Sequence, residues 1–209
     1  MRVKTADRRQ NILAAATAVF RARGYEAASM AEIAVQAGGS KATLYSYFSS
    51  KDDLFRQVMK MQAEEKMSKA FGSLESGEDL RLTLQRFGEN YLSTILSPDL
   101  LVLRSIVMGE GPRSSMGRMF FENGPAEGWG KLAQFLESEM LAGRLRQNKP
   151  WRAAVHLIGL LEADYLEFFM TGLLSAPSLE AIAESVAAAL EVFLGGYRLP
   201  RSSPEGARA

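Results

Sequence analysis

Cysteine is absent from this chain of 209 residues, and histidine occurs once, as His156. The absence of cysteine excludes a disulfide framework, a cysteine nucleophile and a zinc site built on cysteine. A single histidine excludes metal sites that need two, and a serine–histidine–aspartate triad would have to use His156. We therefore predict no catalytic residue, no metal site and no cofactor.

Long apolar runs are also missing. The longest stretch without a charged side chain covers residues 168–179 and contains Gly172, Ser175 and Pro177. This stretch is shorter than the roughly 20 apolar residues that a membrane-spanning helix needs. Five of the first ten residues carry a charged side chain, and no apolar stretch suited to a signal peptide follows them. We expect a soluble, cytoplasmic protein with no membrane partner.

The charges are unevenly distributed along the chain. The net charge is +1, but residues 1–51 contain eight basic against three acidic side chains, a balance of +5, and the remainder carries −4. A basic end indicates a segment that meets a polyanion, although ordinary scatter of surface charge would give a similar balance. Because 47% of the residues are hydrophobic, the chain can form one large or two small packed domains.

Helical periodicity extends over almost the whole sequence. Ile12, Ala16, Val19 and Phe20 fall at i, i+4, i+7 and i+8, which is one stripe of a helix that stops at Gly24. No segment alternates apolar and polar residues as a strand would. The pattern predicts an all-α protein with about nine helices, at about 6–23, 30–37, 41–47, 51–71, 79–96, 99–109, 125–142, 150–174 and 178–195. We expect a DNA-binding domain at 1–52, a helical bundle at 53–197 and a disordered tail at 198–209.

Residues 30–48 have the pattern of two short helices that cross around a tight turn. Ala34 supplies the small residue where the second helix crosses the first, and Gly38 supplies a turn residue that tolerates positive φ. Leu44, six residues further on, supplies the buried apolar residue of the second helix. The segment therefore predicts a helix-turn-helix.

The second helix of such a unit enters the major groove with its N-terminal residues nearest the base edges. Ser40 would cap this helix, and the helix N-terminus can face a phosphate. The outward face consists of Lys41, Ala42, Thr43, Tyr45 and Ser46. These side chains offer a positive charge, a hydroxyl with a methyl group, and a phenol that reaches a phosphate oxygen. For Tyr47, the residues alone favour a place in the core.

A longer motif covers the same segment and reads Ser29-x-x-x-Ile33-Ala34-x-x-Ala37-Gly38-x-Ser40-x-x-Thr43-Leu44-Tyr45-x-Tyr47-Phe48-x-Ser50-Lys51-x-x-Leu54. It resembles the N-terminal signature of TetR-type transcriptional regulators. The resemblance implies that operator DNA is contacted by Ser29, Lys41, Thr43, Tyr45, Tyr47 and Lys51. Gly39 stands where the family usually has valine or another apolar residue, which predicts a looser recognition helix, and Ala42 stands where glycine is common.

The second part of the chain resembles the C-terminal domain of AefR-like TetR regulators, at residues 99–110, 120–126, 159–162 and 172–174. The resemblance implies a homodimer formed through the last two helices and an inducer pocket among the middle ones. Small and apolar residues at helical spacing favour packing against a two-fold mate, although a purely intramolecular bundle would show the same stripe. The predicted dimer residues are Leu160, Ile182, Ser185, Val186, Ala189 and Phe193.

Aromatic and methionine side chains are numerous in the middle helices, and such adaptable groups suit apolar ligands. Polar groups within apolar stretches would orient a polar ligand head. The predicted ligand-binding residues are Phe87, Tyr91, Arg104, Met108, Phe120, Phe121, Trp129, His156, Asp164 and Phe168. Core packing explains any single apolar member equally well, and a lone histidine is more often a core or interface residue.

Together these patterns favour a DNA-binding regulator, namely a repressor that binds a palindromic operator as a homodimer and is released by a small-molecule inducer. Two other classes remain open: a helical adaptor that binds a protein partner, and an all-α enzyme that uses paired carboxylates. The basic N-terminal segment argues against the adaptor, and the lack of cysteine and of a glycine-rich phosphate loop argues against the enzyme. Binding to DNA would weaken steeply with salt, whereas an apolar protein interface would not.

Overall fold

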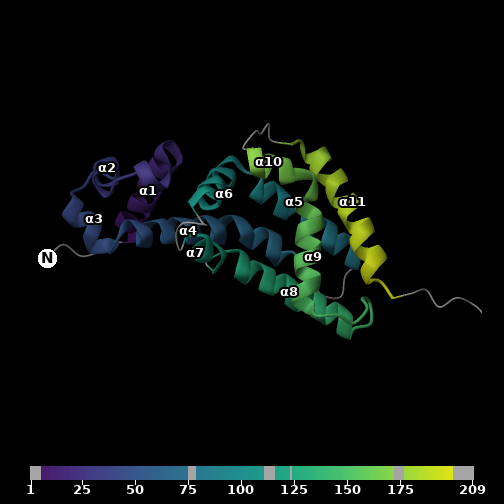
Figure 1. The fold of residues 1–209 in the computed structure, drawn as a ribbon. Helices are drawn as coiled ribbons and strands as arrows, with labels where there is room; N and C mark the ends of the chain where they lie inside the picture. Colours follow the sequence, from purple (N-terminus) through teal and green to yellow (C-terminus); the bar gives the residue numbers. More distant parts are fainter. Residues whose placement is uncertain (1–5, 75–78, 111–115, 123, 172–176, 200–209) are drawn as a thin grey trace, which may run out of the picture. The chain divides into compact units, whose positions relative to one another are not determined.

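The computed structural model describes residues 6–74, 79–110, 116–122, 124–171 and 177–199. Within these ranges the chain forms eleven α-helices, a short 3₁₀-helix and no strand, which confirms the predicted all-α class (Figure 1). In chain order the elements are α1 (Ala6–Ala27), α2 (Met30–Gln36), α3 (Lys41–Tyr47), α4 (Lys51–Gly72), α5 (Leu80–Ile95), α6 (Pro98–Glu110), α7 (Met116–Glu122), α8 (Pro125–Leu141), α9 (Pro150–Glu162), the 3₁₀-helix η2 (Ala163–Tyr165), α10 (Leu166–Thr171) and α11 (Leu179–Tyr197). No helix in the described ranges combines the length and apolar character needed to cross a membrane.

The observed helices differ from the predicted ones in two places. The helix predicted at 150–174 ends at Glu162, and the chain continues through η2 into α10. No glycine or proline lies between Glu162 and Leu166, and within the break Tyr165 is buried, with its hydroxyl 3.2 Å from Ser185 Oγ. Helix α7 was not predicted, because seven residues show little periodicity by themselves and no motif marks them as one marks the equally short α2 and α3.

The chain folds into two compact units. Among the described residues, the first contains 6–69, 94–110, 116–122, 124–128 and 167–171, and the second contains 70–74, 79–93, 129–166 and 177–199. The first unit is larger than the DNA-binding domain predicted at 1–52, because it also includes α6, α7 and most of α4. Residues 200–209, most of the predicted tail, lie outside the described residues.

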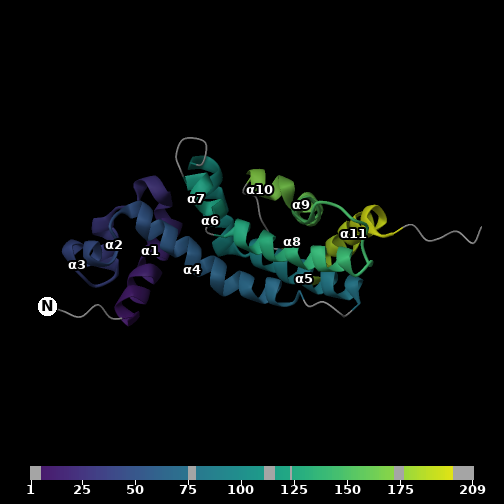
Figure 2. The same ribbon diagram turned by 90° about the horizontal axis from the view of Figure 1, so that it is seen from below.

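The core of the first unit forms where α1, α2, α3 and the start of α4 meet (Figure 2). The predicted stripe of α1 is buried, with Ile12 at 1% and Ala16 at 0% exposure. Phe20 of α1 packs against Phe55 of α4 with ring centroids 5.0 Å apart, and Tyr25 lies 4.9 Å from the same ring. Helix α6 closes this core, since α1 packs against it and its Val107 belongs to the same cluster. The core thus fixes the short helices α2 and α3 on longer ones.

In the second unit, α5 lies close against α9 and α11. A Cβ on Gly88 of α5 would lie 2.7 Å from a γ-methyl of Val186 and 3.0 Å from a δ-methyl of Leu161. The backbone of α5 therefore approaches α11 more closely than any larger residue would allow. Phe87 continues this core, with its ring 5.3 Å from Phe71 and 5.7 Å from Tyr91.

An ion pair between a buried carboxylate and an exposed guanidinium secures the segment that follows α8. The carboxylate of Glu139 is 1% exposed and accepts two hydrogen bonds from the guanidinium of Arg144, one of them 2.7 Å long. The backbone carbonyl of Glu139 also accepts the amide of Arg144, at 2.9 Å. The hydrogen bond to Glu139 raises the pKa of Arg144 above its usual value. A carboxylate buried to this degree depends on such a partner, because an unpaired buried charge is strongly unfavourable.

Candidate nucleic-acid interface

The predicted helix-turn-helix is present in the first unit. Gly38, in the turn between α2 and α3, has a φ of +65°, a conformation that glycine adopts without steric cost. The amide of Gly39 donates to the carbonyl of Ala34 at 2.9 Å and so closes the end of α2. Ala34 and Leu44 are 3% and 1% exposed. The small residue, the turn glycine and the apolar anchor therefore stand where their spacing predicts.

Both short helices are capped by serine at their N-termini. Ser40 Oγ accepts the amide of Thr43 at 3.0 Å, and its hydroxyl lies 2.9 Å from Thr43 Oγ1. Ser29 Oγ accepts the amide of Glu32 at 3.1 Å in the same way. Each cap satisfies one of the N–H groups that a helix leaves free at its start. The hydroxyl of Ser40 is exposed as well, so the capping geometry leaves the N-terminus of α3 open to solvent.

One face of α3 is exposed and carries no acidic side chain. Lys41, Ala42 and Ser46 are exposed, Thr43 is half-buried, and the ring of Tyr45 is 45% exposed. Lys41 Nζ lies 5.9 Å from the centroid of that ring, which brings a cation and a phenol together at the first turn. The Ser46 hydroxyl donates to the carbonyl of Thr43 at 2.7 Å. The structure thus brings five predicted residues to one solvent-facing surface on a single helix.

Tyr47 and Lys51 occupy different surroundings from the other predicted residues. Tyr47 is half-buried and packs against the core of the first unit. Lys51 Nζ donates to the carbonyls of Tyr25, Glu26 and Ala28 at 2.8, 3.2 and 3.2 Å, and it lies 4.3 Å from the centre of the Tyr25 ring. An ammonium has three N–H donors. In this DNA-free structure those of Lys51 serve the end of α1, so this side chain secures the fold.

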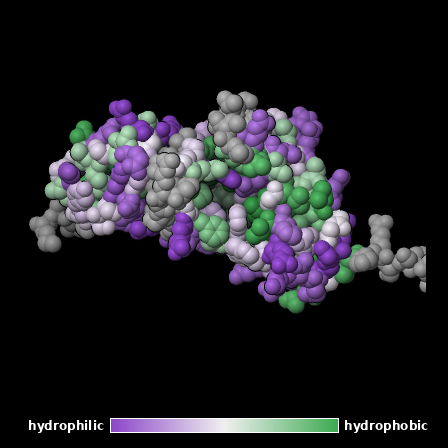
Figure 3. All heavy atoms as spheres, viewed as in Figure 1, coloured by the Kyte–Doolittle hydropathy of each residue, from purple (hydrophilic) through white to green (hydrophobic). Residues whose placement is uncertain are grey.

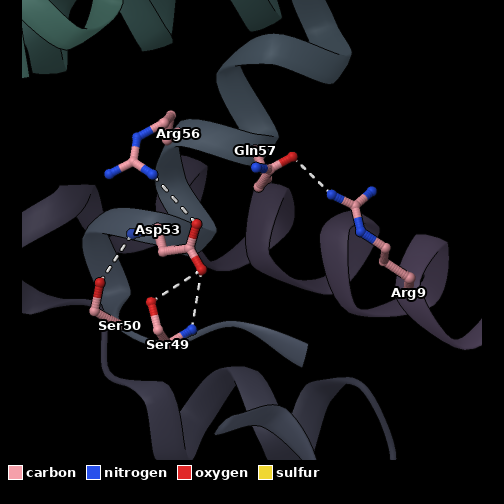
Figure 4. Close-up of polar contacts among 6 residues, drawn as sticks. All are labelled: Arg9, Ser49, Ser50, Asp53, Arg56 and Gln57. Atoms are coloured by element: carbon pink, nitrogen blue, oxygen red, sulfur yellow. Dashed lines mark hydrogen bonds and ion pairs between the residues drawn. The ribbon is translucent and has the colours of Figure 1, made fainter. Parts of the chain in front are cut away.

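The junction between α3 and α4 is held by polar contacts (Figure 4). Ser50 Oγ accepts the amide of Asp53 at 3.0 Å and so caps the N-terminus of α4. The carboxylate of Asp53 in turn accepts the amide and the hydroxyl of Ser49, at 3.0 and 3.2 Å, and lies 3.4 Å from Arg56 Nη1. Arg9 Nη2 donates to Gln57 Oε1 at 2.6 Å and so ties α1 to α4. The exit of α3 is therefore fixed in direction.

Two neighbouring arginines of α1, Arg8 and Arg9, were not among the residues predicted from the sequence. Arg8 Nη1 donates to the carbonyl of Ala37 at 2.8 Å, and the guanidinium of Arg9 lies 5.5 Å from the centre of the Phe48 ring. Ala37 and Phe48 are the C-terminal caps of α2 and α3. The only signal available beforehand was the position of both arginines at the start of the basic segment.

Models of two protein families match this chain. Residues 12–58 match "Bacterial regulatory proteins, tetR family", and residues 82–199 match "AefR-like transcriptional repressor, C-terminal domain". The second match alone covers more than half of the chain. The chain belongs to the TetR family of transcriptional regulators.

Solved structures and curated relatives agree with this assignment. A Mesorhizobium loti protein assigned to the TetR family superposes with a TM-score of 0.85 and 27% identity, over 95% of this chain and 100% of that one. The flavonoid-responsive regulator FrrA gives a TM-score of 0.78 and 31% identity, over the same shares of the two chains. The transcriptional activator FasR of Mycolicibacterium smegmatis is 39% identical over 89 residues, which are 43% of this chain and 41% of FasR. The match thus spans less than half the length of that curated relative.

The structure places the dimer residues predicted for this TetR-family chain in two kinds of surroundings. Ile182, Val186, Ala189 and Phe193 are between 0 and 6% exposed, because this stripe of α11 faces the core of its own unit. Ser185 and Leu160 are half-buried. The large apolar side chains that α9 and α11 leave exposed are others, namely Trp151, Val155, Leu179 and Val192.

The predicted ligand-binding residues are divided between the two units. Phe87, Tyr91, Trp129, His156 and Asp164 belong to the second unit, and Arg104, Met108, Phe120, Phe121 and Phe168 belong to the first. In the second unit Phe87 and Tyr91 stack on each other, and the Tyr91 hydroxyl donates to Glu162 at 2.6 Å. His156 and Asp164 are exposed and, contrary to the prediction, do not share one uninterrupted helix, since α9 ends between them.

The remaining members of the set have varied surroundings. His156 Nδ1 lies 2.8 Å from the hydroxyl of Tyr197. Trp129 packs against Trp151, with ring centroids 6.2 Å apart. Arg104 lies 3.8 Å from the centre of the buried Phe169 ring. Met108 and Phe121 are exposed, whereas Phe120 packs against the core of the first unit. The side chain of Phe168 lies outside the described residues.

Proposed function

We propose that this TetR-family chain is a repressor that binds operator DNA through the exposed face of α3. The observation that carries this proposal is the surface formed by Lys41, Thr43 and Tyr45, which holds a cation, a hydroxyl and a phenol on a helix that has no acidic residue. Groups of this kind contact phosphates and base edges in the major groove. The repressor assignment rests on the description of the C-terminal family match.

The test is fluorescence anisotropy with a duplex taken from the DNA upstream of the gene and a scrambled duplex of equal composition, each at several salt concentrations. We expect tighter binding to the native duplex and a steep loss of affinity with salt. Lys41→Ala should reduce the slope of log K against log salt by about 1, as the loss of one phosphate contact does. Lys131→Ala, which removes an exposed lysine of α8, is the matched control and should leave the slope unchanged.

Two results would contradict this proposal. One is the absence of salt-sensitive binding to either duplex at low salt. The other is an equal effect of Lys41→Ala and Lys131→Ala, because general charge would then explain the binding without α3. Tyr45→Phe, which keeps the ring and removes the hydroxyl, should weaken binding to both duplexes if the phenol contacts a phosphate.

We propose further that two copies associate through the exposed faces of α9 and α11. Val192 of α11 is 63% exposed and Trp151 of α9 is 44% exposed, while Ala188, Gly195 and Gly196 leave the same region of α11 without bulk. Hydrophobic residues gather over part of α9 and α11 on the face seen in Figure 3. Small residues allow close approach of two helices, and a two-fold interface presents the same surface from both copies.

Analytical ultracentrifugation tests the dimer. Val192→Asp should shift the protein to the monomer, since the interface would then bury an unpaired charge on each side of the two-fold axis. Leu141→Asp is the control, because Leu141 on α8 is 77% exposed and belongs to neither helix. A dimer that survives Val192→Asp, or that dissociates equally with Leu141→Asp, would contradict this placement.

A small-molecule inducer completes the proposal. Its support is the 31% identity to FrrA, which is flavonoid-responsive. A ligand that binds the free protein better than the DNA-bound form shifts the population away from DNA by its differential affinity. We therefore expect a flavonoid to raise the melting temperature of the free protein and to release it from the native duplex. If flavonoids stabilise the protein but leave the duplex bound, they are not the inducer class.

A further inference from the structure

The turn of the helix-turn-helix contains a space that another part of the chain fills. Gly39 has no positive φ, so its backbone would accept any L-residue. A Cβ at this position, however, would lie 2.2 Å from Arg8 Nη2. The guanidinium of Arg8 therefore occupies the space where a side chain at residue 39 would lie.

The same guanidinium closes the end of α2. Arg8 Nη1 donates to the carbonyl of Ala37, the C-terminal cap of α2, at 2.8 Å. A positive charge at a helix C-terminus is favourable, because the last carbonyls carry partial negative charge. Arg8 thus connects α1 to the residues that immediately precede α3.

Arg9 performs a similar role at the other end of α3. Its guanidinium lies 5.5 Å from the centre of the Phe48 ring and donates to Gln57 of α4 at 2.6 Å. Phe48 is the C-terminal cap of α3 and is 1% exposed. Successive residues of α1 therefore contact the entrance and the exit of the recognition helix.

We infer that Arg8 and Gly39 form a matched pair, in which the guanidinium replaces a side chain in the turn and sets the orientation of α3. Helix α3 has only seven residues and buries only Leu44 within the described chain, so contacts at its ends fix its direction. Arg8 is then a positioning residue for DNA recognition. The part of this inference that concerns DNA rests on the proposed function.

The pair predicts a specific pattern of rescue. Arg8→Ala removes the contact with Ala37 and empties the space above Gly39. Gly39→Val displaces the guanidinium, because valine and the guanidinium claim the same volume. In the double variant the valine fills the space left by Arg8 and contacts Thr43, whose Cβ lies 4.0 Å from the position of the new Cβ. Arg8→Ala should therefore be harmful. Gly39→Val should be tolerated better, because the displaced group is the far end of a flexible side chain and the valine takes its space. Adding Gly39→Val to Arg8→Ala should restore the turn.

Amide hydrogen exchange of the DNA-free protein tests the pair of Arg8 and Gly39 independently of DNA. The reporter is the amide of Gly39, or of the valine that replaces it, because this amide donates to Ala34. Arg8→Ala should speed its exchange, measured against the intrinsic rate of the residue, by about tenfold, whereas Gly39→Val and the double variant should both keep protection to within about threefold. These factors correspond to the loss and recovery of one ordinary hydrogen-bonding contact. Arg21→Ala, at an exposed position on α1, should not change this exchange.

Binding of the native and scrambled duplexes supplies the second readout. Arg8→Ala should lower the preference for the native duplex by about tenfold while leaving the salt slope unchanged, and Gly39→Val in the same chain should restore the preference. A salt slope reduced by about 1 in Arg8→Ala, with no recovery in the double variant, would make Arg8 a phosphate contact and overturn the inference. Unchanged exchange at the turn in Arg8→Ala would also overturn it. If the wild-type protein binds neither duplex, the proposed function fails while the exchange experiment still decides on the pair.

Discussion

Gly88→Ala is the most direct test of the packing in the second unit. The new methyl carbon would lie 2.7 Å and 3.2 Å from the two γ-methyls of Val186 and 3.0 Å from a δ-methyl of Leu161. Overpacking of this kind costs about 1–3 kcal/mol. Replacing glycine by alanine inside a helix returns about 1 kcal/mol. Because three contacts are too short at once, we expect the variant to lose about 1–2 kcal/mol of unfolding free energy.

A compensating change makes this reasoning refutable. Val186→Ala removes both γ-methyls and should by itself cost about 2 kcal/mol or more from lost burial and the cavity left behind. In the double variant the methyl of residue 88 enters that cavity. The loss of unfolding free energy in the double variant should therefore be smaller than the sum of the two single losses by about 1 kcal/mol or more. Urea unfolding followed by circular dichroism measures each free energy, with an unchanged m-value as the check on a two-state transition.

The matched control is Gly130→Ala on α8, where a Cβ would meet nothing within 4 Å. This variant should gain up to about 1 kcal/mol from helix propensity alone. A Gly88→Ala protein as stable as Gly130→Ala would refute the close approach of α5 to α11. Additive costs in the double variant, within about 0.5 kcal/mol, would refute it as well.

Three further variants test contacts described above. Ser40→Ala removes the cap of α3 and should lower the unfolding free energy by about 1 kcal/mol. It should also weaken binding to the native duplex in anisotropy. Unchanged values in both measurements would exclude a contribution of this cap to α3. Lys51→Met removes the donors to the end of α1 and should lower the free energy of unfolding in urea by about 2 kcal/mol. It should leave the slope of log K against log salt unchanged, and a slope reduced by about 1 would place Lys51 in the DNA interface. Arg144→Ala leaves the buried carboxylate of Glu139 without its partner and should lower the urea midpoint more than Glu139→Gln does, and the opposite order would contradict a charged pair.

The helix-turn-helix could be predicted because its constraints are local. Ala34, Gly38 and Leu44 lie within eleven positions of one another, and each residue type answers a steric need at its own place in the unit. Lys51 could not be assigned in the same way. Its partners, the carbonyls of Tyr25, Glu26 and Ala28, lie 23–26 residues earlier, and backbone carbonyls leave no mark in a sequence.

The role of the apolar stripe on α11 could not be decided from the sequence for a different physical reason. Helix α11 is apolar on more than one side: Val186 and Phe193 face its own unit, while Val192 is exposed. Periodicity shows that a helix has an apolar face, but it does not show whether that face meets the same chain or a second copy. The same limit applies to the aromatic residues predicted to bind ligand, since Phe87 fills a core as well as it would line a pocket.

The shallow anchoring of α3 has a consequence for the evolution and engineering of operator preference. Leu44 is the only side chain of α3 that is less than a tenth exposed in the described structure. The positions that face solvent, such as Lys41, Ala42 and Tyr45, contribute little to stability. Substitutions at exposed positions usually change the unfolding free energy by less than about 0.5 kcal/mol. A library randomised at these three positions should therefore consist largely of folded proteins, and selection could act on sequence preference without first having to repair the fold.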